Sequence, residues 1–302
     1  MTQSPFNTAH RPDVGIAERL APDLRVVTAP NAGPMTFTGT RTYLLGDREI
    51  AVIDPGPDDP AHFAALMDAI GPARVGAILI THSHLDHSPL APRLSRATGA
   101  PVHGFGRHDA ARAPIMTELG NLGGGEGVDQ GFQPDMTLTD GQDLCGDGWA
   151  VGVVHLPGHL SNHVGFSSGD RLFSGDHVMG WATTLISPPD GDLTAFMASL
   201  DTCLARRDRI YYPGHGAPVE DPHNLVSHIR DHRKNREAQI MAALDGQSAD
   251  VAQLTARIYA DVDPRLHGAA SRNVLAHVID LYGRGIIATD GAFSLGGQFR
   301  QV

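Results

Sequence analysis

The chain has 302 residues, of which 41% are hydrophobic and 19% charged, so it can build a packed core and wholesale disorder is excluded. A net charge of −11, from 23 Lys and Arg against 34 Asp and Glu, disfavours bulk attraction to nucleic acid. No apolar run is long enough to cross a membrane, and residues 1–20 lack the apolar stretch of a secretory signal, so we expect a cytoplasmic protein without a membrane partner. The 17 histidines are unusual, because His is the commonest metal ligand.

The elements of the first two thirds of the chain follow from turn residues and from the spacing of apolar side chains. Residues 1–23 are rich in Pro and polar side chains and predict a loose N-terminal arm. Short β-branched runs predict strands, and amphipathic runs predict helices. Strands are expected at 24–30, 40–46, 48–56, 75–84, 100–106, 135–141, 148–158, 163–169, 171–176 and 209–216, and helices at 59–70, 88–99 and 192–206. This alternation predicts mixed α/β layers over a domain of residues 24–221.

The pattern becomes helical over residues 222–302. Helices are expected at 225–244, 251–260 and 271–285, followed by a hairpin over 286–296 with Asp290-Gly291 at its turn. Three helices followed by a two-stranded wing predict a winged-helix-like domain. Five Arg balance five Asp within residues 246–302, and a neutral module is a weak nucleic-acid binder. Packing against the first domain, or formation of a homodimer, is therefore its expected role.

Metal-competent side chains gather where four of the predicted strands end. The run Thr81-His82-Ser83-His84-Leu85-Asp86-His87 directly follows apolar residues. One turn cannot complete the coordination of a metal ion, so further ligands must come from elsewhere. Three other strand ends each offer a His or Asp beside a glycine: Pro157-Gly158-His159, Ser174-Gly175-Asp176 and Pro213-Gly214-His215-Gly216.

The run THSHLDH, with the later PGH, SGD and PGHG, resembles the metallo-β-lactamase superfamily of hydrolases over roughly residues 24–220. The early turn Ile53-Asp54-Pro55-Gly56 is also similar to that superfamily. The appended helices resemble the subgroup of the β-lactamase-like protein 2 relatives. The resemblance implies an αββα sandwich with metals at one rim of its two sheets, followed by a C-terminal winged-helix domain.

The same resemblance implies two divalent metal ions, with zinc expected and iron or manganese also suited to the ligands. Asp54 is expected to orient a ligand rather than to bind metal, and His177, which follows Asp176, is a further candidate for that role. The first metal would be held by His82, His84 and His159 and the second by Asp86, His87 and His215, with Asp176 bridging the two.

The implied reaction is hydrolysis of a small-molecule substrate. A hydroxide that bridges the metals would attack a small ester, thioester or lactone. Asp86 is expected to orient this nucleophile or take its proton, and His163 is a candidate for protonating the leaving group. Two alternatives stay open: a single-stranded RNA endonuclease, and a non-catalytic winged-helix regulator with a metal-sensing domain. No basic, aromatic-bearing groove is apparent in the sequence, so the RNA hypothesis ranks second.

Each of three further features has two possible interpretations. Met179, Trp181 and Phe196 could line a substrate pocket or belong to the core. The glycine-rich segment 123–127 could cover the metals, although a surface loop with no role is favoured. The basic face Arg230, Arg233, Lys234 and Arg236 could contact phosphate, although a solvated helix face is favoured.

Overall fold

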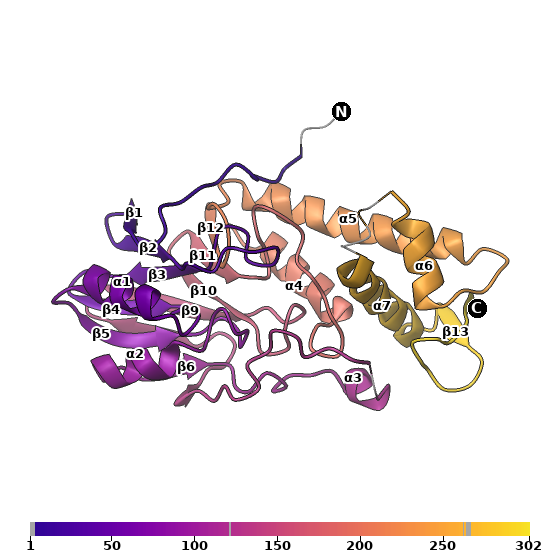
Figure 1. Cartoon of the computed structure of the whole chain (residues 1–302), viewed down its shortest axis with the longest axis horizontal. Helices are drawn as coiled ribbons and strands as arrows, with labels where there is room; N and C mark the ends of the chain where they lie inside the picture. Colours follow the sequence, from indigo (N-terminus) through magenta and orange to yellow (C-terminus); the bar gives the residue numbers. More distant parts are fainter. Residues whose placement is uncertain (1–3, 121, 262, 264–266) are drawn as a thin grey trace.

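Two β-sheets lie face to face, with helices on their outer surfaces and a helical domain at one end (Figure 1). This computed structural model describes residues 4–120, 122–261, 263 and 267–302. The expected αββα sandwich with a C-terminal winged-helix-like domain is confirmed. Within the described residues, no helix is both long and apolar enough to cross a membrane.

The first sheet contains seven strands in chain order. Its antiparallel part is β1 (Ala17–Ala21), β2 (Leu24–Thr28), β3 (Arg41–Leu45) and β4 (Glu49–Ile53), and β5 (Arg74–Leu79), β6 (Val102–Gly104) and β7 (Met136–Thr137) run parallel to β4. Helices α1 (Pro60–Ile70) and α2 (Ala91–Thr98) cover its outer face with apolar side chains such as Leu66 and Leu94. Asp59 begins α1 by accepting the His62 N–H at 2.8 Å, as its position before a proline predicts.

The second sheet contains five strands in the order β12-β11-β10-β9-β8. These are β8 (Asp143–Gly146), β9 (Trp149–His155), β10 (Val164–Ser168), β11 (Arg171–Gly175) and β12 (Ile210–Pro213). Only β11 and β12 are parallel among them, because helix α4 (Leu193–Ala205) connects the two. Helices α4 and α5 (Pro222–Ala243) cover the outer face of this sheet.

The core between the sheets is built largely from aromatic and branched side chains. Tyr43 from the first sheet meets Phe173 and Tyr212 from the second at ring-centroid distances of 5.2 and 5.6 Å. Phe166 and Val164 are fully buried in the same layer. Burying each large apolar side chain contributes about 1.5–3 kcal/mol, so this layer holds the two sheets, and the strand ends at their rim, in a rigid arrangement.

The helical domain has its own core. It contains the second half of α5, α6 (Val251–Ile258), α7 (His267–Gly283), and the hairpin of β13 (Ile287–Thr289) and β14 (Phe299–Gln301). The short helix α3 (Pro114–Glu118) reaches this core from the sandwich through Met116, as its place beside α7 indicates (Figure 1). A capping box between Asp250 and Gln253 begins α6.

Two predicted boundaries are wrong. The last part of the expected loose arm forms β1, an edge strand whose side chains are mostly exposed, so it pairs with β2 through the main chain and leaves no apolar pattern in the sequence. The hairpin does not close within 286–296, because its second strand is β14, where buried Phe299 pairs with Thr289. Strand β8 was absent from the predicted elements, because its side chains alternate only between half-buried and exposed.

Candidate metal centre

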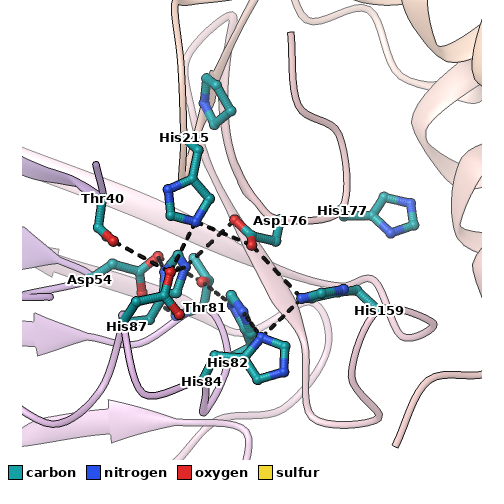
Figure 2. A network of polar contacts seen from close by, with 12 residues as sticks. Thr40, Asp54, Thr81, His82, His84, His87, His159, Asp176, His177 and His215 are labelled. Carbon is teal, nitrogen blue, oxygen red and sulfur yellow. Dashed lines mark hydrogen bonds and ion pairs between the residues drawn. The ribbon is translucent and has the colours of Figure 1, made fainter. Parts of the chain in front are cut away.

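All seven predicted ligands meet at one rim of the sandwich, where strands of both sheets end. Four of them lie in the turn after β5, and the other three follow β9, β11 and β12. Parallel pairing of β11 with β12 places Asp176 and the segment of His215 side by side, and Figure 2 shows these side chains converging with the histidines of the first sheet. The rigid sheets therefore position donors that are distant in sequence.

The donor atoms form two groups, and within each group they lie within 4.8 Å of one another: His82, His84, His159 and Asp176 in the first, and Asp86, His87 and His215 in the second. Asp176 joins the groups. Its Oδ1 lies 3.5 Å from His87 Nε2, and its Oδ2 lies 3.4 Å from His215 Nε2 and 3.8 Å from His159 Nε2. One carboxylate therefore contacts ligands of both groups.

The chemistry of this donor set fits two divalent cations. His87 Nε2, His215 Nε2 and Asp176 Oδ1 are buried and have no partner of hydrogen-bond geometry among the described residues, although His215 Nε2 lies 3.0 Å from Asp86 Oδ2. Buried polar atoms in proteins almost always have such a partner, and a cation satisfies imidazole nitrogens and carboxylate oxygens equally well. The cluster also combines imidazoles with carboxylates, a mixture that suits zinc, iron or manganese.

Asp54 fixes the orientation of His87. The carboxylate accepts the Nδ1–H of His87 at 2.9 Å, and it accepts both the N–H and the Oγ1–H of Thr81 at 2.7 Å. Thr81 Oγ1 also lies 2.9 Å from Nδ1 of His82. These bonds turn the Nε2 atoms of both imidazoles toward the centre, and the orienting role of Asp54 stays a prediction that this geometry favours.

Main-chain carbonyls orient two further histidines. His159 donates from Nδ1 to the carbonyl oxygen of Leu185 at 2.9 Å, and His215 donates from Nδ1 to that of Gly39 at 3.2 Å. Thr40, beside Gly39, donates from Oγ1 to Asp86 Oδ2 at 3.4 Å. The Leu185 and Gly39 carbonyls could not be predicted from the sequence, because a carbonyl is present in every residue, and Thr40 was not among the predicted site residues.

Burial and neighbouring charges set the protonation of the cluster. Burial, with the nearby His159, lowers the pKa of His84 to about 3, so this imidazole is neutral and able to bind a metal. Burial opposes protonation of His215, but the carboxylate of Asp176 raises its pKa to about 10. The same pairing, with His87, holds the pKa of Asp176 well below its usual range despite burial. A bound cation would displace the proton of His215.

The side chains of His163 and His177 lie outside the cluster of ligands. His163 is fully buried behind Asp176, whose main-chain N–H donates to His163 Nε2 at 3.1 Å. His177 packs against Phe196 at a ring-centroid distance of 4.6 Å and lies apart from the polar network (Figure 2). Burial, with the nearby His159, lowers the pKa of His177 to about 3, and neither ring nitrogen forms a hydrogen bond with a predicted ligand.

A pocket of about 390 Å³ opens beside the cluster, and we call it the metal pocket. His84, Asp86, His159 and Asp176 form one wall, and the remaining lining comes from Asn31, Met35, Thr36, Pro57, Leu85, Glu126, Gly127 and Leu185. A main-chain hydrogen bond, from the Leu85 N–H to the Gly127 carbonyl at 2.8 Å, holds the glycine-rich loop against the turn that carries the ligands. The loop thus lies at the site rather than at a remote surface.

Known families match most of the chain. Residues 35–215 match the metallo-beta-lactamase superfamily, and residues 251–295 match the beta-lactamase associated winged helix domain. The beta-lactamase-like protein 2 homolog of Drosophila melanogaster is 31% identical over 279 residues, which cover 87% of this chain and 89% of the relative. The atrochrysone carboxyl ACP thioesterase of Aspergillus fumigatus is 32% identical over 242 residues, which cover 77% of this chain and 68% of the relative.

Solved structures share the same architecture. A beta-lactamase domain protein from Burkholderia ambifaria has a TM-score of 0.81 at 20% identity and covers 99% of this chain and 97% of its own. A protein solved in a di-iron-bound form has a TM-score of 0.50 at 28% identity and covers 66% of this chain and 96% of its own. The chain belongs to the metallo-beta-lactamase superfamily and carries that superfamily's associated winged-helix domain at its C-terminus.

Proposed function

We propose that the chain is a binuclear metal-dependent hydrolase that acts on a small thioester, ester or lactone. The observation that carries this proposal is the contact of Asp176 with both groups of donors beside an open pocket. A relative of 32% identity that is named a thioesterase supports the thioester over the other two substrates. Membership of the superfamily supports hydrolysis in general.

The side chains of the cluster divide the work of the reaction. Two bound cations would polarise the carbonyl of the substrate and lower the pKa of a water molecule. Asp86 is the ligand best placed to orient that water or accept its proton, because it lines the metal pocket and its side chain is 25% exposed. His163 is assigned to holding the main chain of Asp176, since its Nε2 is engaged there and the residue does not line the pocket.

Zinc is the proposed metal, because neutral imidazoles and carboxylates suit it and its bound water ionises near neutral pH. The relative solved with two irons makes iron the main competitor. Elemental analysis of protein expressed with equal zinc, iron and manganese supply tests the assignment. Zinc at close to two ions per chain is the expected result, and two irons or manganese ions per chain would contradict it.

The decisive assay uses metal-loaded protein against matched acetyl thioesters, acetyl esters and lactones. The exchange Asp176→Asn should lower kcat/KM by about 100-fold or more, because it removes a charge that both groups of donors share. Asp170→Asn is the control, since Asp170 pairs with Arg209 at the surface. Absence of turnover by wild-type protein with two metals bound would refute the proposed function.

The RNA endonuclease and the metal-sensing regulator stay predictions, as do a homodimer and a cytoplasmic location. Single-stranded RNA incubated with the same metal-loaded protein separates the first alternative from the proposal. Cleavage that Asp176→Asn abolishes would favour the endonuclease, whereas intact RNA together with thioester turnover supports the proposal.

A further inference from the structure

A second pocket, of about 380 Å³, lies where the sandwich meets the helical domain, and we call it the interdomain pocket. It shares Met35 and Leu185 with the metal pocket, so the two pockets are contiguous. Building on the proposed function, we propose that the interdomain pocket binds the distal arm of the substrate, an apolar acyl chain that ends in a carboxylate. The substrate class is then a thioester or ester of a dicarboxylic acid.

Apolar side chains from both domains form most of the interdomain pocket. Met179 and Trp181 come from the loop after β11, and Tyr259 and Ala270 come from the helical domain. Trp181 is held in place by stacking on Phe37 at a centroid distance of 5.0 Å and an interplanar angle of 8°. Such walls favour an aliphatic chain over a polar one, because binding the chain removes apolar surface from water.

Two arginines of α5 supply positive charge to this apolar pocket. Arg233 is 3% exposed, and it donates to Asn273 Oδ1 at 3.1 Å and to the carbonyl of Thr184. Arg236 is half-buried and lies with its guanidinium carbon 4.1 Å from the centroid of the Tyr259 ring. The favoured prediction of a solvated helix face is therefore wrong for Arg233 and Arg236, because both arginines line the pocket.

The positive charge of these arginines lacks a carboxylate within the described part of the protein. The lining of the pocket contains no Asp or Glu, and neither Arg233 nor Arg236 forms an ion pair with a described residue. Nε of each arginine and Nε1 of Trp181 are also buried without an acceptor among the residues that the structure describes. Buried cations are normally paired, and guanidinium groups bind carboxylates with particular geometric fit. An apolar chain that ends in a carboxylate would fill the apolar walls of the pocket and pair with the positive charge of the two arginines.

The test compares two thioesters of N-acetylcysteamine that differ only at the end of the acyl chain. Suberoyl and octanoyl chains have the same length, but only the suberoyl chain ends in a carboxylate, and an acetyl thioester reaches the metal pocket alone. The metal-loaded wild-type protein should hydrolyse the suberoyl thioester with a kcat/KM about tenfold higher than that of the octanoyl thioester. Equal values for these two substrates would overturn the proposal.

Variants of the interdomain pocket test whether its residues cause the preference for the suberoyl thioester. Arg236→Gln should reduce kcat/KM for the suberoyl thioester to the octanoyl level. Lys234 is an exposed residue of the same helix outside the pocket, so Lys234→Gln should leave this kcat/KM unchanged. Ala269→Phe places a ring in the pocket and should lower turnover of both long thioesters. Acetyl thioester turnover should be unchanged in all three variants, and an equal loss for every substrate would contradict the assignment.

A binding measurement separates this inference from the proposed function. Titration calorimetry of the metal-loaded protein with suberate and with octanoate needs no catalysis, and each acid offers one carboxylate to the metals. Suberate should bind about tenfold more tightly, and Arg236→Gln should remove the difference. If no thioester is hydrolysed but this difference is found, the proposed function fails and the pocket assignment holds. If thioesters are hydrolysed without the difference, the pocket assignment fails alone.

Discussion

Asp54 contacts the candidate metal centre through Thr81 and His87. It has a positive φ of 50°, which lets its carboxylate reach Thr81 and His87 together. Asp and Asn adopt this left-handed conformation more readily than other residues with a side chain. The exchange Asp54→Asn therefore keeps the backbone and changes only the charge.

Asp54→Asn should weaken metal binding by about 10- to 100-fold, because the neutral amide makes His87 a less basic ligand. Titration with a competing chelator measures this change. Asp58→Asn is the matched control, since Asp58 is exposed and pairs with Arg93 at the surface. Unchanged metal affinity in Asp54→Asn would show that the hydrogen bond to His87 is dispensable.

The buried His62 predicts a loss of stability in mild acid. Burial lowers its pKa in the folded protein to about 4, from an ordinary value of 6.5. The unfolded chain therefore binds the proton first, and stability decreases as the pH falls from 6.5 toward 4. Between about pH 7 and about pH 5 the effect of this residue should reach roughly 2 kcal/mol.

Urea unfolding of metal-free wild-type protein and His62→Gln at both pH values measures this contribution. His62→Gln removes the titrating ring, so its free energy of unfolding should fall by less than that of the wild type. Equal losses in the two proteins would mean that His62 is protonated in the folded state as readily as in the unfolded state.

Site residues with a polar side chain at a strand end could be predicted, whereas their carbonyl partners could not. The glycine-flanked His159, Asp176 and His215 each follow an apolar run, and each lies at the centre. The position of His177 beside Asp176 suggested a supporting role, but its side chain lies apart from the ligands. Asp176 and His177 lie in the turn after β11, where the His177 N–H donates to the Ser174 carbonyl at 3.1 Å, so the two side chains leave the turn in different directions.

At the scale of elements, prediction succeeded where one face is apolar and failed where contacts are made by the main chain. Helices α1 and α4 begin after Asp59 and Asp192, whose carboxylates accept the main-chain N–H groups of His62 and Ala195. Edge strand β1 has exposed side chains and β14 has three residues, so neither has a pattern of alternation to read.

The glycine-rich loop beside the metal pocket should be sensitive to side chains at one glycine. Gly124 has a φ of +91°, and a Cβ there would lie 2.8 Å from the carbonyl oxygen of Pro188. Gly124→Ala should therefore displace the loop that carries Glu126 and reduce kcat/KM severalfold. Gly120→Ala is the control, because Gly120 also has a positive φ of +74° but no atom within 4 Å of the added Cβ.

The strain of a positive φ costs each variant about 1 kcal/mol, and the contact with Pro188 adds to the loss of stability in Gly124→Ala alone. The steady-state rate with an acetyl thioester is therefore compared at a temperature where both variants are folded. A Gly124→Ala protein with the kcat/KM of Gly120→Ala would show that the position of this loop does not matter for turnover.

At the scale of the whole molecule, the two domains are joined by polar contacts as well as by apolar ones. Arg233 from α5 connects Thr184 of the sandwich to Asn273 of α7, and Thr194 of α4 donates to Asp280 of α7 at 2.6 Å. These residues lie far apart in sequence, so their pairing could not be read from the chain. Arg233 and Asn273 also line the interdomain pocket.

We therefore expect that a chain cut at the proposed domain boundary, residue 221, does not fold stably on its own. A chain ending there lacks Leu225, Val226 and Ile229, which are buried against the outer side of the second sheet. Removing them exposes apolar surface, so we expect this truncated chain to aggregate during size-exclusion chromatography. A chain ending at residue 244 retains α5 and should remain less aggregated. A monomeric truncated chain with the thermal stability of the full protein would contradict this expectation.

Leu185 combines two roles in separate parts of one residue. Its carbonyl oxygen accepts from His159, and the residue lines both the metal pocket and the interdomain pocket. Replacing the side chain alters the shape of both pockets while the carbonyl stays in place. If the proposed function holds, mutation and natural selection can change which acyl groups are accepted at this position while the hydrogen bond to His159 is kept, and variants of Leu185 offer a starting point for directed evolution of specificity.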